Sequence, residues 1–143
     1  MDVIKVALDG LQERVATYGK EAETLCNRHF EFVMAMNKRK GWDSKSKLYA
    51  LTRVRGYGLT VNWYEVSWYG SKAQNNRRSV KKLITKPAKS YGYNFATLLK
   101  YAQPWEVDLV KEIETELAEI RRKVSVYSKA LLHLKQVERL ETE

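Results

Sequence analysis

The fold is decided by the stretch Arg53-Val54-Arg55-Gly56-Tyr57-Gly58-Leu59-Thr60-Val61-Asn62-Trp63-Tyr64-Glu65-Val66-Ser67-Trp68-Tyr69-Gly70. β-Branched and aromatic residues favour strands, and the glycines at 56 and 58 suit the positive φ values of a hairpin turn. A four-residue loop over 55–58 would pair Val54 with Leu59 and Ala50 with Trp63. One face is then mostly apolar and the other polar and basic, so we predict an amphipathic β-ribbon.

The alternation of apolar residues breaks after Trp63, where Glu65 and Ser67 fall on the former core face. Either a β-bulge changes the direction of the strand here, or both faces of the sheet are covered by other parts of the protein at this end. Further along, residues 77–86 favour a third, basic strand, with a short basic helix as the alternative. The aromatic residues of this region are expected to lie mainly in the core.

A long helix is predicted before the ribbon, because apolar residues recur there in steps of four and three. The pattern implies about 35 residues, or roughly 50 Å of helix. We expect it to end near Asn37–Lys40, with Gly41 as a left-handed cap. The apolar seam of this helix is interrupted by one polar residue, His29. The predicted seam consists of Ile4, Leu8, Leu11, Val15, Tyr18, Ala22, Leu25, His29, Phe32 and Met36.

A second long helix is predicted after Pro104, with Glu106 and Asp108 in its first turn, where the helix dipole favours acidic residues. A short helix over 95–102, capped by Asn94, is expected to precede it. The seam of the second long helix reads Val110, Ile113, Leu117, Ile120, Val124, Tyr127, Leu131 and Leu134.

These elements predict an α+β fold in which two long antiparallel heptad helices form a hairpin and flank a small antiparallel β-meander. The 143 residues suit a single domain, 1–143. Its parts are the first helix (1–40), the basic ribbon region (41–93) and the short helix with the second long helix (94–143). We expect the ribbon to pack at the open end of the hairpin against Phe95, Leu98 and Leu99. A two-helix stalk has little core, so a homodimer through the helical seams is also expected.

The charge of the chain is concentrated in its middle third. The net charge is +9 overall, but residues 38–90 alone hold fourteen Lys and Arg against two Asp and Glu. Such a focused positive field attracts polyanions. The sequence shows neither a membrane-spanning run nor a signal peptide, and the single Cys26 excludes an intramolecular disulfide, so a cytoplasmic protein is expected.

Catalytic chemistry has little support in the sequence. His29 and His133 lie in the helical arms without motif partners, and Cys26 lacks a second cysteine at metal-binding spacing. Glu65 is expected to pair with a neighbouring arginine or lysine. No phosphate-binding glycine loop is present. We therefore predict no enzyme activity, no cofactor and no metal.

Nucleic-acid binding is the function that the basic region favours, and duplex DNA is the expected ligand because a two-stranded ribbon fits the major groove. Stacking of unpaired bases on exposed aromatic rings would instead indicate single-stranded DNA or RNA. A third hypothesis is a coiled-coil adaptor protein whose basic region binds an acidic partner protein. The candidate DNA-binding residues are Lys45, Lys47, Arg53, Arg55, Thr60, Asn62, Lys72, Arg77, Arg78, Lys81, Lys82, Lys86 and Lys89.

Three short segments of the sequence resemble those of a known protein family. They are Trp68-Tyr69-Gly70-Ser71-Lys72, Leu98-Leu99-Lys100-Tyr101-Ala102 and Glu119-Ile120-Arg121-Arg122. In these segments the chain resembles MobI-type auxiliary mobilisation proteins of conjugative plasmids and integrative conjugative elements, over roughly residues 50–140. The resemblance implies a non-enzymatic factor that acts at the origin of transfer together with a separate relaxase.

Overall fold

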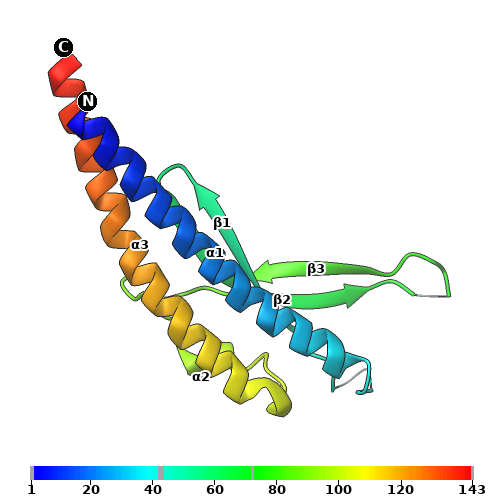
Figure 1. The fold of residues 1–143 in the computed structure, drawn as a ribbon. Coiled ribbons are helices and arrows are strands. Elements are labelled where there is room, and N and C mark those ends of the chain that lie inside the picture. Colours follow the sequence, from blue (N-terminus) through cyan, green and yellow to red (C-terminus); the bar gives the residue numbers. More distant parts are fainter. Residues whose placement is uncertain (1, 42–43, 72, 143) are drawn as a thin grey trace.

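Two long helices run antiparallel along the whole molecule and bring the chain ends together (Figure 1). The computed structural model describes residues 2–41, 44–71 and 73–142. Helix α1 spans Val3–Asn37 and helix α3 spans Val107–Thr142, with the three-stranded sheet between them in sequence. The predicted α+β fold and the antiparallel helical hairpin are confirmed.

The buried stripe of α1 differs from the predicted seam. Leu8, Val15, Ala22 and His29 are buried as expected, but the flanking buried positions are Gly19, Cys26 and Val33. The predicted flanking residues lie closer to α3, as the contact between the rings of Tyr18 and Tyr127 shows, with centroids 5.7 Å apart. All residues of the predicted seam are buried or half-buried, but the seam missed this second buried row, which exists because α1 packs against two partners, α3 on one side and the sheet on the other.

The helix boundaries follow local capping chemistry. At the start of α1 the Asp2 carboxylate accepts hydrogen bonds from the backbone N–H groups of Ile4 and Lys5. The helix ends at Asn37, and Lys38 caps it in a right-handed conformation. The prediction of a left-handed cap at Gly41 was wrong, because the described glycines with positive φ are Gly56 and Gly70.

The elements between the sheet and α3 are shorter than the sequence indicated. Helix α2 covers only Phe95–Leu98 instead of 95–102, with the Asn94 side chain accepting from the N–H of Ala96, as predicted for its cap. The 3-10 turn η2, Pro104–Glu106, then leads directly into α3.

The sheet has the strand order β1-β2-β3 and is antiparallel throughout. Strand β1 spans Leu48–Arg55, β2 spans Gly58–Tyr69 and β3 spans Arg78–Leu83, so the third strand is confirmed. The predicted register is also confirmed, with Val54 opposite Leu59 and Ala50 opposite Trp63. The loop is tighter than the four residues predicted, because Arg55 also pairs with Gly58. Within this loop only Gly56 has positive φ, which matches a two-residue turn with glycine at its first central position.

The β1–β2 hairpin lies along the helices and does not pack at their open end. Its apolar residues near the turn reach the middle of α1, where Leu59 and Val54 would both lie 3.7 Å from a side chain added at Gly19. On the other side the Ser128 hydroxyl of α3 donates to the carbonyl of Tyr57. Of the residues predicted to contact the ribbon, Leu98 is buried in the core and Leu99 packs against it half-buried, whereas Phe95 is exposed. The ribbon turns back because both helices offer it a longer apolar surface there.

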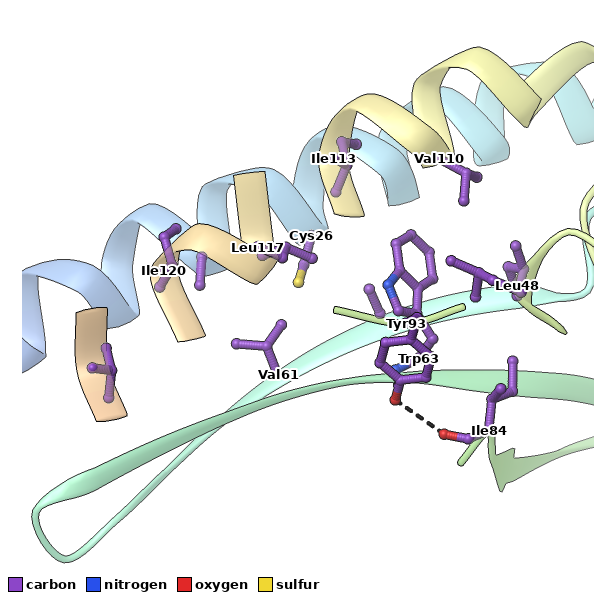
Figure 2. Close-up of a cluster of buried hydrophobic side chains, with 14 of the residues drawn as sticks. Cys26, Leu48, Val61, Trp63, Ile84, Tyr93, Val110, Ile113, Leu117 and Ile120 are labelled. Carbon is purple, nitrogen blue, oxygen red and sulfur yellow. Dashed lines mark hydrogen bonds between the residues drawn. The ribbon is translucent and has the colours of Figure 1, made fainter. Parts of the chain in front are cut away.

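Trp63 is the centre of the core and is fully buried (Figure 2). Its indole N–H donates to Glu114 at 2.9 Å, and its backbone N–H donates to the hydroxyl of Tyr93 at 3.0 Å. That hydroxyl in turn donates to the carbonyl of Ile84, and burial raises the pKa of Tyr93, which keeps the hydroxyl protonated as a donor. Arg121 completes the network with two hydrogen bonds to the Glu114 carboxylate.

A second buried polar network holds the start of β1 against η2. His29 lies 2.9 Å from the carboxylate of Glu106, which also accepts from the Ser46 hydroxyl at 2.9 Å. Its other oxygen accepts from the backbone N–H of Gln103 at 3.1 Å. The predicted structural role of His29 is consistent with these contacts, whereas Glu106 is a buried partner and not merely an acidic residue in a first helical turn.

Candidate nucleic-acid interface

The second half of β2 and the whole of β3 form a ribbon that projects away from the helices (Figure 1). We call residues 64–83 the arm, of which residue 72 lies outside the described part. Every residue of β3 is exposed, as are Trp68 and Tyr69 at the end of β2. The arm is an extension of the sheet that the helices do not cover.

The register of the arm sorts its side chains onto two faces. Residues that stand opposite each other on antiparallel strands share a face. Tyr69 stands opposite Arg78 and Glu65 opposite Lys82, on the face that continues the core side of the sheet. Lys81 stands opposite Val66 on the outer face. The adjacent lysines at 81 and 82 therefore leave the arm in opposite directions.

The strand continues through the break in alternation without a bulge. Pairing with β1 reaches Glu65 and pairing with β3 runs on to Tyr69, each in a continuous register. The predicted bulge is therefore wrong, and the alternative of two covered faces holds only in part, because residues 64–67 are half-buried while the paired β3 is exposed. The ion pair predicted for Glu65 is absent from the described part of the chain, although Lys82 stands opposite it.

The tip of the arm is held by its own hydrogen bonds. The Asn76 side chain accepts from the N–H of Ser71 at 2.7 Å, and the N–H of Asn76 donates to the Ser71 carbonyl at 3.2 Å. Gly70 has φ of 81°, and a side chain added there would collide with the backbone of Asn76. Glycine is therefore required where the strand enters the loop.

The cations of the arm are exposed and carry a net positive field. Arg77, Arg78, Lys81 and Lys82 are all exposed. Arg77 lies over the ring of Trp68, with its guanidinium carbon 5.1 Å from the ring centroid. The ion pairs of the described residues involve Arg28, His29, Arg121, Arg122 and Lys135, which all lie on the helices. The acidic partners in these pairs lie in η2 and α3, whereas the arm contains a single acidic residue, Glu65.

A second group of predicted residues meets in a groove beside α3, with a volume of about 540 Å³. Thr60, Asn62, Lys86 and Lys89 line it. Asn62 is half-buried, with its side-chain oxygen 3.5 Å from the Tyr93 hydroxyl. Lys86 is partly engaged with the backbone, since its ammonium donates to the carbonyls of Pro87 and Ser90.

The sequence did not indicate that α3 contributes to this groove. Lys129 lines it together with Arg121, whose charge is neutralised by Glu114. Glu114 and Arg121 are seven residues apart, two helical turns, and each adjoins a seam position. That spacing of opposite charges beside an apolar seam was the available signal for the buried pair. Nothing in the sequence indicated Lys129, because only the fold brings it close to Lys86 and Lys89.

The remaining predicted residues are dispersed. Arg53 stands opposite Thr60 on the outer face of the hairpin, and both are exposed. Arg55 is exposed beside the turn. Lys45 and Lys47 line a groove of about 210 Å³ at the base of the arm, with Glu65 and Trp68. Lys72 lies outside the described residues.

The aromatic residues divide between core and surface. Trp63 is fully buried, as predicted, but Trp68 is 49% and Tyr69 52% exposed. Tyr64 is half-buried on the outer face. The prediction that these rings lie mainly in the core was wrong for the arm, because no helix covers it.

The described residues offer little for catalysis. Burial raises the pKa of the Cys26 thiol to about 12, so the nucleophilic thiolate is disfavoured near neutral pH. His133 is exposed on α3. Among the described residues no group of three or more histidine, cysteine or acidic residues is placed to hold a metal ion. Within the same residues, no helix combines the length and apolar character needed to cross a membrane.

The family model described as MobI protein matches residues 18–135, which is most of the chain and includes the sheet and the greater part of both long helices. No curated protein matches the chain, and no solved structure does.

Proposed function

The chain belongs to the MobI family, a family of mobilisation-related accessory proteins, and on that premise we propose that it is a non-enzymatic DNA-binding protein. In this proposal the protein binds the origin of transfer as duplex DNA and assists a separate relaxase. The observation that carries it is the exposed, cationic arm that projects from a helical body whose own charges are nearly balanced.

The shape of the arm supports binding to duplex DNA. A two-stranded antiparallel ribbon fits the major groove, and cations on both of its faces would lie near the phosphates on either side. Arg78 and Lys82 extend from one face and Lys81 from the other. The groove with Lys86, Lys89 and Lys129 would then hold the flanking backbone of the same duplex.

Direct reading of bases would fall to residues beside the arm. Arginine and asparagine side chains match the edges of guanine and adenine. Arg53 is exposed and free to approach a groove, whereas Asn62 is half-buried within the lysine-lined groove. We therefore assign Arg53 the larger share of sequence preference.

A gel-shift experiment tests this function. The probes are an origin-region duplex, a scrambled duplex, a single strand and an RNA of equal length, each across a salt series. The proposal expects tightest binding to the origin duplex and a steep loss of affinity as salt rises. Preference for the single strand or the RNA would instead support base stacking, and no binding at low salt would reject the function.

A homodimer is also part of the proposal, with an interface that differs from the seams. The seams are buried between α1 and α3 of one chain, so a second copy would have to use exposed apolar residues of α3. Val126, Leu132 and Leu140 are 58%, 57% and 71% exposed. Light scattering at micromolar concentration should give a dimer mass; a monomer mass would remove the dimer and leave DNA binding untouched.

A further inference from the structure

Apolar side chains are exposed in a row on the C-terminal half of α1, beside the base of the arm. Phe30 and Met34 are 43% and 45% exposed and lie four residues apart, so they adjoin on one face of the helix. Neither belongs to the buried stripe that packs on the sheet and on α3. Together they form a small exposed apolar patch, the kind of surface through which proteins bind partners.

The row opens into a groove between α1 and the arm, with a volume of about 380 Å³. We call it the Met34 groove. Its lining residues are Met34, Asn37, Lys38, Lys45, Trp68 and Arg77. The half-exposed Trp68 and the flexible Met34 offer an apolar floor that can adapt to an inserted side chain.

The rim of the Met34 groove is cationic. Lys38, Lys45 and Arg77 line the groove, and none of its described lining residues is acidic. Lys81 lies close to the adjoining row, with its ammonium 4.8 Å from the ring centroid of Tyr49, whose ring also meets that of Phe30. Glu65 lines the neighbouring groove, from the opposite face of β2. An occupant must therefore combine apolar anchors with negative charge.

We propose that the Met34 groove, with the adjoining Phe30, is a docking surface for an acidic amphipathic helix of a partner protein. An amphipathic helix inserts anchors spaced three and four residues apart into an apolar groove, and its acidic flanks would face the lysines and arginine of the rim. This inference adds a protein-binding surface to the proposed DNA-binding one and does not depend on it.

The same surface is less suited to unpaired bases. Bases stack on open ring faces. Here one face of Trp68 is covered by the guanidinium of Arg77, and one face of Tyr49 by the ammonium of Lys81. Phe30 meets Tyr49 edge to face, with ring planes at 89°. Phe30 and Met34 lie on helix α1, where they can pack against apolar side chains of a partner. They do not form a flat surface on which bases could stack.

A random peptide library tests the proposal without a known partner. Phage-displayed 16-residue peptides are selected on the full-length protein, and peptides that also bind the Met34→Glu variant are removed. The recovered peptides should be acidic, with apolar residues at helical spacing. In fluorescence anisotropy, synthetic copies should bind Met34→Glu at least about tenfold more weakly, a change of about 1.4 kcal/mol.

The matched control is Val6→Glu, which makes the same apolar-to-acid change at an exposed position at the other end of α1. It should leave peptide binding within about twofold, well below the expected effect. Recovered peptides without acidic enrichment, equal losses in the two variants, or an equal loss of oligo-dT binding in Met34→Glu would each overturn the proposal. Duplex binding is measured on the same proteins: its absence while the peptides still bind would reject the DNA proposal and leave this one standing.

Discussion

One strand, β2, runs through two contrasting environments. Its first half, with β1, lies against both helices, and Val61 and Trp63 there are 1% and 0% exposed. Its second half, with β3, leaves the helices and exposes Trp68 and Tyr69 by about half of their surface. The backbone pairing is continuous across the change. The same ladder thus serves as core at one end and as a projecting surface at the other.

The difference teaches that the helices, not the strand, decide which residues are core. Each half contains a tryptophan, but only the first half has Glu114, Arg121 and Tyr93 to hold it. The second half has exposed cations in their place. Substitutions in the two halves should therefore separate stability from binding.

The largest effect is expected from breaking the buried network. Glu114→Gln leaves the buried Arg121 without its counter-charge and should lower the free energy of unfolding by about 3–5 kcal/mol. Urea unfolding followed by circular dichroism measures this. The control is Glu119→Gln, which breaks the solvent-exposed pair with Arg122 and should leave the urea midpoint almost unchanged. Similar losses in both variants would contradict the role given to the buried network.

The two tryptophans of β2 provide the sharpest internal comparison. Trp63→Ala removes a fully buried ring and should cost about 3–5 kcal/mol in unfolding free energy. Trp68→Ala removes a half-exposed ring and should cost less than about 1 kcal/mol. Thermal and urea unfolding of the two variants give the difference. Equal costs would show that the arm is packed as firmly as the core.

Arg53→Ala should relax sequence preference without loss of stability. A good arginine–guanine contact contributes about 1–3 kcal/mol of discrimination, so the affinity ratio of origin duplex to scrambled duplex should fall by roughly tenfold. Competition gel shifts measure the ratio. Lys47→Ala, an equal loss of charge at an exposed position, is the control and should weaken both duplexes alike. A ratio that falls equally in both variants would remove Arg53 from base reading.

The smallest effect concerns the single thiol. Burial raises the pKa of Cys26 from 9.0 to about 12, so the folded protein should react slowly with iodoacetamide at pH 8. A thiol placed on the arm by Ser79→Cys should react at the rate of a free cysteine. Because the folded pKa is the higher one, the stability from the protonated thiol is present below pH 9.0 and is lost as the pH rises toward 12. Rapid alkylation of Cys26 would contradict its burial.

The hairpin register and the helical hairpin were predictable because strong local patterns specify them. Gly56 sets the turn, and the alternation from Ala50 to Trp63 sets the face. The seam of α3 was predictable because it faces one continuous apolar surface, with Val110, Ile113 and Leu117 all fully buried.

What could not be predicted depends on neighbours that are distant in sequence. Gly19 and Cys26 join the buried stripe of α1 only because the hairpin folds back along it. Lys129 meets Lys86 and Lys89 across the fold. Trp68 is exposed because neither long helix covers it. The local sequence around Trp68 does not indicate whether a distant helix packs on that position. The candidate site was therefore predictable as a basic region, but its division into arm and groove was not.

The central claim is that the arm binds duplex DNA, and a salt series of anisotropy titrations with charge-matched variants tests it most directly. Lys81→Ala/Lys82→Ala removes two exposed charges from the arm, and Lys5→Ala/Lys111→Ala removes two from the helices. Since each lost phosphate contact lowers the slope of log affinity against log salt by about 0.9, we predict a slope smaller by about 1–2 for the arm variant. The helix variant should keep the slope of the unmodified protein. Equal slopes for the two variants would contradict the account.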